Sequence, residues 1–236
     1  MNLREAIDAL ESAAKNALEA ALSDDKTPLR NALALREAAS LVGAGGDNPD
    51  VVILGDLNDF KKLNDEFGHD AGDAAIYEVG KLIQERLAER CKAQAFRRSG
   101  DEFVILLSSR FLEDFKAEAG SFASCSFQFN EMTIQTAMSF GYAVRHGEAG
   151  FTELFAKAEI ACQAAKSQGD GACVGWSEEI ERDMTDRLRA RCAKCGAVIW
   201  CDVPRQAVPK NKKLLFCPCC GESLAGNELL PQETQP

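Results

Sequence analysis

The chain has 236 residues, of which 46% are hydrophobic, enough for one domain-sized core and a small further module. Its 37 acidic and 27 basic residues give a net charge of −10, which argues against nonspecific nucleic-acid binding by the molecule as a whole. The sequence has neither an apolar run of the roughly 20 residues that a bilayer span needs nor the pattern of a signal peptide. We therefore expect a cytoplasmic protein without a membrane partner.

The N-terminal region predicts two helices. Residues 2–22 carry apolar side chains at alternating spacings of three and four, which is typical of a helix. This stripe can pair with a copy of itself or lie on its own domain, and both possibilities stay open. A second helix is expected to begin at Pro28, which suits a first helical turn, and to end near the turn at 43–50.

From residue 51 onward, short strands and helices are intermixed. Strands are predicted at 51–56, 92–98, 103–107, 126–130 and 132–145, and helices at 60–67, 73–90, 111–123 and 152–168. The polar turn at 99–102 joins two of these strands as a β-hairpin. This order favours an α+β fold, in which helices cover a sheet that contains antiparallel hairpins.

Two acidic sites occur where a predicted strand meets a turn. Asp56 ends an apolar strand, and Asp101 and Glu102 lie at the tip of the predicted hairpin. If the two strands are neighbours, their carboxylates meet at one edge of the sheet and offer the hard oxygen ligands that Mg²⁺ prefers. Such a site suits phosphoryl transfer. The alternative is that acidic residues simply favour turns.

These stretches carry a specific resemblance to a known family. The blocks GDLNDFKKLNDEFGHDAGD (55–73) and RRSGDEFVIL (97–106) resemble the signature of GGDEF-domain diguanylate cyclases, here as an SGDEF variant. Three further blocks in the same order extend the resemblance over residues 24 to 176: DDKTPLRN (24–31), MSFGYA (138–143) and AEIACQAAKSQG (158–169). It implies a palm-like nucleotidyl-cyclase fold that makes cyclic di-GMP from GTP.

The resemblance implies a set of metal and catalytic residues. Asp56 and Asp101 match the side-chain ligands of Mg²⁺ or Mn²⁺, and the backbone carbonyl of Leu57 matches a further ligand. Glu102 matches the acidic residue that assists deprotonation of the attacking 3′-hydroxyl. The resemblance therefore places the chemistry at the two acidic sites already noted.

Four other residues match contacts to the substrate GTP. Asn64 and Asp73 match the pair that reads guanine, and Lys61 and Lys166 match the contacts to the triphosphate. A carboxylate can accept hydrogen bonds from the adjacent N1–H and N2–H of guanine together, whereas adenine lacks this donor edge. Asp73 therefore favours GTP over ATP.

Several residues depart from the family pattern near the expected site. Ser99 replaces the first glycine of the signature, and Asn58 replaces a frequent aspartate. Asp170 stands where the family has an arginine that contacts phosphate. An acidic group near a triphosphate should weaken GTP binding unless it faces away.

Further departures affect regulation and the N-terminal block. The product-inhibition site of the family needs an arginine and an aspartate ahead of the hairpin; Arg90 is present, but Ala93 replaces the aspartate. We therefore expect weak or absent feedback inhibition. In the block at 24–31 and just after it, three residues differ from the typical ones: Lys26, Pro28 and Ala32.

The ten cysteines fall into two settings. Four occur singly in apolar surroundings and are expected to be core side chains: Cys91, Cys125, Cys162 and Cys173. The other six crowd near the C-terminus, which in a reducing compartment indicates metal binding rather than disulfides. Two CxxC pairs have the spacing of a structural Cys₄ Zn²⁺ ribbon: Cys192, Cys195, Cys217 and Cys220. Buried or redox-active thiols are the alternative, and Cys219 competes with Cys220 as fourth ligand.

The expected organisation has five parts. These are an N-terminal helix with possible dimerisation (1–22), a cyclase domain (23–176), a linking helix (177–191), a basic zinc ribbon (192–225) and a flexible tail (226–236). The leading hypothesis is a Mg²⁺-dependent homodimer that condenses two GTP into cyclic di-GMP. One alternative is a module that binds guanine nucleotide without turnover and docks to nucleic acid or protein through the ribbon. Another is a cyclase making a different cyclic nucleotide, against which Asp73 argues.

Overall fold

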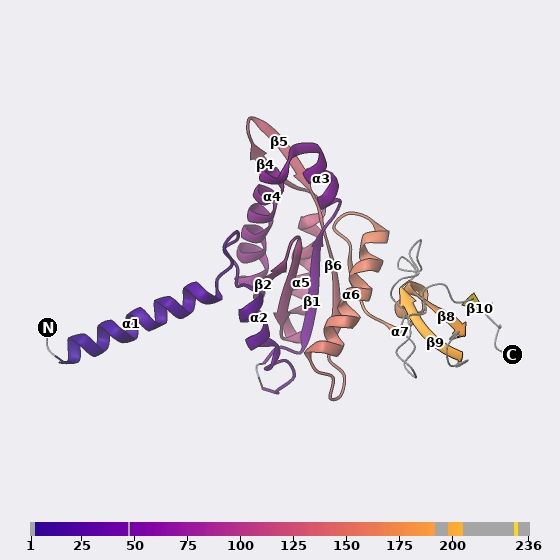
Figure 1. Ribbon diagram of the computed structural model, residues 1–236, viewed down its shortest axis with the longest axis horizontal. Helices are drawn as coiled ribbons and strands as arrows, with labels where there is room; N and C mark the ends of the chain where they lie inside the picture. The colour runs from indigo at the N-terminus through magenta and orange to yellow at the C-terminus, as the bar shows by residue number, and fades with distance from the viewer. Residues whose placement is uncertain (1–2, 47, 192–197, 205–228, 231–236) are drawn as a thin grey trace. The chain divides into compact units, whose positions relative to one another are not determined.

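The computed structural model describes residues 3–46, 48–191, 198–204 and 229–230, with side chains described as far as Met184. The chain divides into two compact units, Met1–Trp176 and Ser177–Pro236. The first unit is built on a five-stranded sheet with the order β2-β3-β1-β6-β7 (Figure 1). Its strands are β1 (Val51–Leu57), β2 (Gln94–Ser99), β3 (Glu102–Leu107), β6 (Met138–Val144) and β7 (Cys173–Gly175). All neighbours are antiparallel except β6 and β7, so the expected α+β fold is confirmed.

Helices cover both faces of this sheet. One face packs against α4 (His69–Leu82), the π-helix η1 (Ile83–Ala88) and α5 (Leu112–Ala119), and the other against α2 (Ala32–Ala39) and α6 (Phe151–Gln168). Successive residues of the central strand β1 alternate between the two cores, because side chains of a strand point to opposite faces. Burial on both faces explains why the residues of β1 ahead of Asp56 read as a continuous apolar run.

The packing of α6 against β6 positions the C-terminal turn of that helix. A Cβ added at Gly141 of β6 would lie 2.0 Å from the backbone nitrogen of Cys162. Only glycine therefore allows this close approach of helix and strand. It brings Lys166, one turn after Cys162, to the end of β1.

A smaller layer lies beside α3 (Phe60–Phe67). The strands β4 (Cys125–Phe129) and β5 (Met132–Thr136) form a separate two-stranded hairpin, drawn next to α3 in Figure 1. The hairpin, α3 and α4 share a small core formed by Leu63, Ala71, Ala75, Phe127 and Ile134. Two short 3₁₀ helices, η2 (Ser109–Phe111) and η3 (Gly120–Ala123), flank α5, where one helix was predicted at 111–123.

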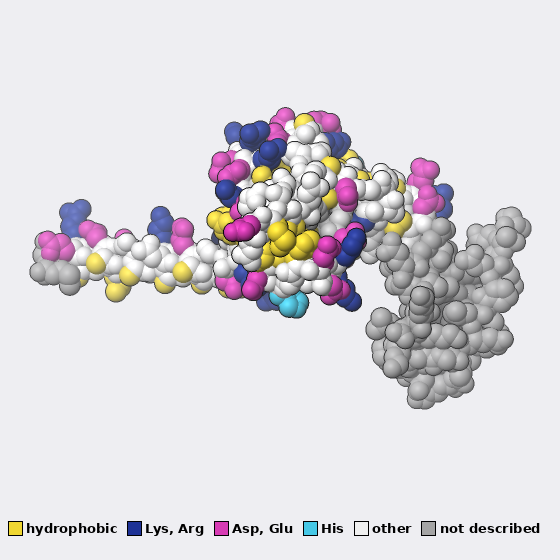
Figure 2. Space-filling model, turned by 90° about the horizontal axis from the view of Figure 1, so that it is seen from above, with side chains coloured by type: hydrophobic (Ala, Val, Ile, Leu, Met, Phe, Trp, Pro, Cys, Tyr) yellow, Lys and Arg dark blue, Asp and Glu magenta, His cyan; other side chains and the backbone are white. Residues whose placement is uncertain are grey.

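The N-terminal helix is confirmed as α1 (Leu3–Leu22). Three large apolar side chains on it are exposed: Ile7 at 48%, Leu10 at 75% and Leu18 at 58%. Figure 2 shows hydrophobic side chains gathered along one side of α1. The residues of the first unit therefore leave these side chains uncovered.

The predicted start of the second helix is wrong. The helix α2 begins at Ala32 instead of Pro28, because the side chain of Asn31 caps it by accepting hydrogen bonds from the N–H groups of Leu33 (3.0 Å) and Ala34 (3.1 Å). The residue before the cap, Arg30, forms β-bridges to Ser23 and Phe96. Residues 24–31 therefore form a bent loop, closed by the hydrogen bond from the N–H of Asp24 to the carbonyl of Leu29, that joins the edge strand β2 through Arg30; we call them the 24–31 segment.

Two further boundaries differ from the prediction. The long helix predicted at 73–90 begins at His69, because Gly68 adopts a left-handed φ of +86° between α3 and α4, and it continues beyond Leu82 as the π-helix. The single strand predicted at 132–145 is two strands separated at Ala137. The carbonyl of Ala137 accepts from the N–H of Asn58, and the chain leaves the β4–β5 hairpin there to pair with β1. The short strand β7 was not predicted.

The second unit departs most from expectation. The linking helix predicted at 177–191 is helical only as α7 (Glu178–Met184), while Thr185–Arg191 forms strand β8. The strand β8 pairs with β9 (Val198–Pro204) and β10 (Leu229–Leu230). Alternating apolar and polar residues, with Leu188 and Ala190 two apart, are typical of a strand and explain the error. The expected tail at 226–236 contributes β10.

The single cysteines are confirmed as core side chains. Cys91, Cys125 and Cys162 are buried, and Cys173 is half-buried. Burial raises the pKa of Cys162 to about 12 and that of Cys91 to about 11. These thiols therefore stay protonated near neutral pH and are poor nucleophiles.

Candidate active site

The two acidic sites predicted from the sequence meet at one end of the sheet. The strands β1 and β3 are antiparallel neighbours, and Asp56 lies opposite Glu102 in their register. The N–H of Leu57 also donates to the carbonyl of Asp101 at 3.4 Å. The condition on which the predicted site depended, that the two strands are neighbours, is therefore met.

Asp56 lies in a half-buried, charged environment. Its side chain is 18% exposed, and Nζ of Lys166 donates to its Oδ1 at 2.5 Å. Burial raises the pKa of Asp56, the hydrogen bond and charge of Lys166 oppose this rise, and the neighbouring charges of Asp101 and Glu102 add to it. The charges of Asp101 and Glu102 thus disfavour the ionised form of Asp56, which a bound cation would stabilise.

Glu102 is held by two residues of the preceding strand. Nη1 of Arg98 donates to its Oε2 at 2.5 Å, and Oγ of Ser99 donates to the same oxygen at 3.2 Å. Gly100 forms the tip of the hairpin with a φ of +52°. Ser99, a departure from the family signature, thus supplies a side-chain hydrogen bond that a glycine could not make.

A small cavity of about 100 Å³ lies beside these carboxylates. Its lining includes Asp56, Glu102 and Lys166, together with Glu159 and Gln163 of α6. Small-molecule sites commonly enclose roughly 300–1,000 Å³, so the cavity suits an ion or one reacting group. Sequence reasoning missed Glu159 and Gln163, although their spacing of four and three from each other and from Lys166 places them on one helix face.

The predicted base-reading residues lie on adjacent helices. Asn64 is in α3, and a Cβ added at Gly72 of α4 would lie 2.0 Å from its Oδ1. The Asn64 side chain therefore packs against the residue that precedes Asp73. Its Oδ1 is buried and has no hydrogen-bond partner among the described residues, so it is an acceptor that a ligand N–H could satisfy.

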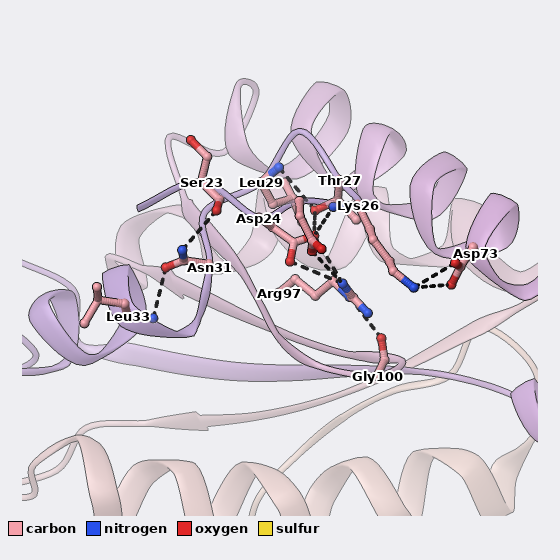
Figure 3. Close-up of polar contacts among 11 residues, drawn as sticks. Ser23, Asp24, Lys26, Thr27, Leu29, Asn31, Leu33, Asp73, Arg97 and Gly100 are labelled. Carbon is pink, nitrogen blue, oxygen red and sulfur yellow. Dashed lines mark hydrogen bonds and ion pairs between the residues drawn. The ribbon is translucent and has the colours of Figure 1, made fainter. Parts of the chain in front are cut away.

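Asp73 has a partner that sequence reasoning did not foresee. Nζ of Lys26 donates to both of its carboxylate oxygens at 2.7 Å (Figure 3). Both side chains are exposed, at 41% for Lys26 and 50% for Asp73. The signal available in the sequence was that Lys26 departs from the family pattern, but its partner lies 47 residues away.

The 24–31 segment is tied to the hairpin that carries Asp101 and Glu102. Asp24 accepts from Oγ1 of Thr27 at 2.9 Å and from the N–H of Lys26 at 3.2 Å. It also pairs with Arg97 at 3.2 Å, whose Nε donates to the carbonyl of Gly100 at 3.0 Å (Figure 3). The side chains of Asp24 and Arg97 are 9% and 11% exposed, so this is a nearly buried ion pair.

Two departures from the family pattern contact each other. Nδ2 of Asn58 donates to Oδ1 of Asp170 at 2.7 Å. Both residues line a second pocket of about 230 Å³ between the end of β1, α3 and the β4–β5 hairpin. Among the residues whose side chains are described, Asp170 is therefore held by a neutral partner and makes no ion pair.

The remaining predicted residues are dispersed. Lys61 lies exposed in the first turn of α3 and makes no hydrogen bond or ion pair with the described residues. Arg90 forms an ion pair with Glu118 at 2.9 Å. Within residues 3–184, the ion-pair partner of Arg90 is thus Glu118 and not residue 93, where this chain has Ala93 and the family has an aspartate.

Metal-binding clusters were also sought among the described residues. In that part of the chain, no group of three or more His, Cys, Asp or Glu side chains is arranged to hold a metal ion. The predicted zinc ligands Cys192, Cys195, Cys217 and Cys220 lie outside the described residues. In the same part of the chain, no helix has the length and apolar character required to span a membrane.

The chain matches a known protein family. A family model described as "Diguanylate cyclase, GGDEF domain" matches residues 21–172. The chain is 31% identical over 188 residues to the bifunctional diguanylate cyclase/cyclic di-GMP phosphodiesterase MucR of Pseudomonas aeruginosa, covering 76% of this chain and 27% of MucR. It is 30% identical over 180 residues to the response regulator PleD of Caulobacter vibrioides, covering 71% of this chain and 39% of PleD. The chain thus spans between about a quarter and two fifths of these relatives' length.

Solved structures show the same fold. The coiled coil and GGDEF domain of DgcB from Caulobacter crescentus, in complex with c-di-GMP, superposes with a TM-score of 0.60 at 20% identity, covering 73% of this chain and 94% of that one. A diguanylate cyclase/phosphodiesterase from Caldicellulosiruptor saccharolyticus superposes with a TM-score of 0.56 at 25% identity, covering 66% of this chain and 94% of that one.

Proposed function

The chain belongs to the GGDEF-domain diguanylate cyclase family, and from this premise we propose that it condenses two molecules of GTP into cyclic di-GMP as a Mg²⁺-dependent homodimer. The observation that carries the proposal is the meeting of Asp56, Glu102 and Lys166 at one end of the sheet. Two carboxylates and one ammonium group around a small cavity suit phosphoryl transfer assisted by a divalent cation.

The residues at this edge fit a divalent cation. Asp56 and Asp101 would provide carboxylate oxygens and Leu57 its backbone carbonyl, which are the hard ligands that Mg²⁺ or Mn²⁺ takes. Substrate phosphate oxygens and water would complete the shell, so a cluster of three protein carboxylates is not required. When bound, the cation would offset the charge of the triphosphate and lower the pKa of the attacking hydroxyl.

The chain's own residues have separate tasks in this proposal. Glu102, oriented by Arg98 and Ser99, accepts the proton of the 3′-hydroxyl of one GTP. The 3′-oxygen forms a bond to the α-phosphorus of the other GTP, and the bond to pyrophosphate breaks. Lys61 and Lys166 bind the triphosphate, and Lys166 must exchange part of its contact with Asp56 for the phosphates.

Base recognition falls to Asn64 and Asp73. Asp73 accepts from N1–H and N2–H of guanine, and the buried Oδ1 of Asn64 is a further acceptor without a partner among the described residues. This assignment favours GTP and argues against a different nucleotide as substrate.

Asp170 bears on whether the site binds a triphosphate. Its hydrogen bond to Asn58 ties one carboxylate oxygen to the end of β1. The amide of Asn58 is neutral, so this contact does not offset the charge of Asp170 near the proposed phosphates. We therefore expect turnover, with weaker triphosphate binding than an arginine at this position would support.

The product has two-fold symmetry, so two protomers must each present one GTP. We propose that α1 pairs with a copy of itself and supplies this dimer. The exposed apolar side of α1, with Ile7, Leu10 and Leu18, supports the pairing, because such a stripe is uncovered within the first unit.

For the second unit we propose a structural Zn²⁺ site and a cytoplasmic location. The support is the spacing of the two CxxC pairs and the reducing environment in which clustered thiols bind metal instead of forming disulfides. The basic residues around these cysteines suit docking to nucleic acid or to an acidic protein. Elemental analysis of the purified chain is expected to find one Zn²⁺ per chain that is lost in Cys217→Ser; a metal-free wild type would contradict the site.

The experiment that tests the activity is product analysis. The purified chain is incubated with Mg²⁺ and an equimolar mixture of the four ribonucleoside triphosphates, and mass spectrometry is expected to find cyclic di-GMP. Asp101→Ala should abolish the product, while Asp114→Ala, an exposed carboxylate on α5, should leave it unchanged. Absence of any dinucleotide in the wild type, with guanine nucleotide still bound, would support a binding module instead. A different dinucleotide would redirect the substrate assignment.

A further inference from the structure

The contact between Lys26 and Asp73 extends the base site by one residue. We propose that Lys26 is a specificity-determining residue that donates a hydrogen bond to O6 of guanine while Asp73 accepts from N1–H and N2–H. The inference rests on the proposed function, because it takes Asp73 as the residue that reads guanine. It assigns Lys26 a role that its departure from the family pattern does not suggest.

The geometry places an ammonium group where the base would arrive. Nζ of Lys26 lies 2.7 Å from each carboxylate oxygen of Asp73, on the side of the carboxylate that offers both oxygens at once (Figure 3). A base that donates to both oxygens must approach from the same side. In the proposal, Nζ of Lys26 gives up this position to the base and moves toward the six-position, which neighbours N1.

The backbone of Lys26 is fixed, whereas its side chain is not. Thr27 is buried against Gly80 of α4, where an added Cβ would lie 2.8 Å from the Thr27 Cβ. On the other side, Asp24 holds the N–H of Lys26 and pairs with Arg97. The 24–31 segment is therefore anchored two turns along α4 from Asp73, and the four-carbon stem of Lys26 is free to shift along the carboxylate.

The hydrogen-bonding pattern of guanine matches this pair. Its Watson–Crick edge presents an acceptor at O6 followed by donors at N1 and N2, whereas an ionised aspartate offers acceptors alone and a lysine donors alone. Adenine presents a donor at position six and an acceptor at N1, so it would oppose both charges. A lysine beside Asp73 thus rejects adenine by repulsion as well as favouring guanine by attraction.

The exposure of Lys26 and Asp73 favours a role in recognition over one in which Lys26 blocks Asp73 until GTP binds. A lysine that masked Asp73 would have to resist displacement, but ion pairs between side chains that are 41% and 50% exposed are weak. GTP can therefore displace Lys26 from its contact with Asp73 at little cost. A hydrogen bond from an ammonium group to O6 within the bound complex compensates for the lost contact.

The test measures equilibrium binding with nucleotides that cannot react. Calorimetry with Mg²⁺ compares 3′-deoxy-GTP, its 6-thio derivative, which keeps N1–H and N2–H but carries a poor acceptor at position six, and the 3′-deoxy inosine nucleotide, which lacks the N2 amine. Lys26→Met is expected to weaken 3′-deoxy-GTP roughly tenfold, the effect of one charge-assisted hydrogen bond. The wild type should prefer 3′-deoxy-GTP over the 6-thio derivative, and Lys26→Met should lose that preference.

Three controls separate recognition from a structural effect. Lys26→Arg should retain most of the preference for oxygen at position six, because it keeps a donor and a positive charge. Lys81→Met removes an exposed lysine from the same helix as Asp73 and should change nothing. The loss on removing the N2 amine should be equal in the wild type and in Lys26→Met, since that contact belongs to Asp73.

The contrary outcomes separate a failure of this inference from a failure of the proposed function. Tighter binding of 3′-deoxy-GTP by Lys26→Met would make Lys26 a mask and overturn the inference. Equal weakening of 3′-deoxy-GTP and the 6-thio derivative would reduce Lys26 to a support for Asp73 and also overturn it. Unchanged binding by Lys26→Met would do the same while leaving the proposed function intact. A wild type that binds no guanine nucleotide would overturn the proposed function as well.

Discussion

Two aspartate–lysine pairs in the first unit share the same chemistry and differ in their surroundings. Asp56 and Lys166 meet beside a small cavity, with side chains that are 18% and 37% exposed. Lys26 and Asp73 meet at the surface, with side chains that are 41% and 50% exposed. The first pair lies close to two further carboxylates, because Asp101 and Glu102 both act on the charge of Asp56.

The difference shows how burial separates two uses of the same ion pair. At Asp56, burial and the neighbouring negative charges raise the pKa of the carboxyl group. The ionised form of Asp56 is therefore disfavoured, and a bound cation would stabilise it. At Asp73, water solvates both groups and their contact is easily exchanged for contacts to a base. The half-buried pair suits metal and phosphate, and the exposed pair suits reversible recognition.

The largest effect is expected from a substitution that breaks the pair of Asp56 and Lys166 beside the cavity. Asp56→Asn removes the charge on which cation binding depends, so the rate of cyclic di-GMP formation should fall roughly 10³-fold, the equivalent of several kcal/mol. Asp73→Asn should cost roughly tenfold in binding of GTP, because it weakens hydrogen bonds without removing the metal site. Initial rates and titration of GTP on both variants check the order. Equal losses in rate would show that the two pairs do not differ in function.

A second prediction concerns the buried ion pair that anchors the exposed one. Asp24→Asn should lower the free energy of unfolding by about 2–4 kcal/mol, because it leaves Arg97 nearly buried without its charged partner. Denaturant titration of Asp25→Asn provides the matched control. The Asp25 side chain is 85% exposed and lies 3.9 Å from Arg97, so its loss should cost less than about 0.5 kcal/mol. Similar values for the two variants would contradict the assigned role of Asp24.

The smallest effect is expected from a substitution at Gly72, which packs against Asn64 and precedes Asp73. Gly72→Ala places a Cβ 2.0 Å from Oδ1 of Asn64 and should push that side chain out of position. GTP binding should weaken about 3–10-fold, the loss of one hydrogen bond, with little change in the Asp56 pair. Gly120→Ala, whose added Cβ meets no heavy atom within 4 Å, should bind GTP normally. A Gly72→Ala variant with unchanged affinity would exclude Asn64 from base recognition.

Much of the first unit could be predicted from local patterns. The apolar run before Asp56 and the hairpin at 99–102 were read correctly, because each depends on neighbouring residues. The start of α2 was not, since Pro28 suits a helix locally while Arg30 pairs instead with Ser23 and Phe96. The strand at 132–145 was misread for the same reason, because its division at Ala137 follows from a contact with Asn58.

The candidate site shows the same division. Motifs predicted Asp56, Asp101, Glu102 and Lys166 as site residues. The structure brings Asp56, Glu102 and Lys166 to one small cavity, and the carbonyl of Asp101 accepts from the N–H of Leu57 at the end of β1. Lys26 and Asp170 were noted only as departures, because neither makes sense without its partner. Their partners, Asp73 and Asn58, lie 47 and 112 residues away in the chain.

By itself, the sequence determined the family, the α+β class and the acidic residues at the ends of β1 and the hairpin, because these follow from short motifs and from hydrophobic periodicity. The tertiary structure decided which charges meet. Pairing of β1 with β3 sets Asp56 opposite Glu102, the close contact of α6 with β6 delivers Lys166, and the 24–31 segment carries Lys26 to Asp73. Such contacts depend on chain segments far apart in sequence, and the energy of each is set by its burial, which no local pattern encodes.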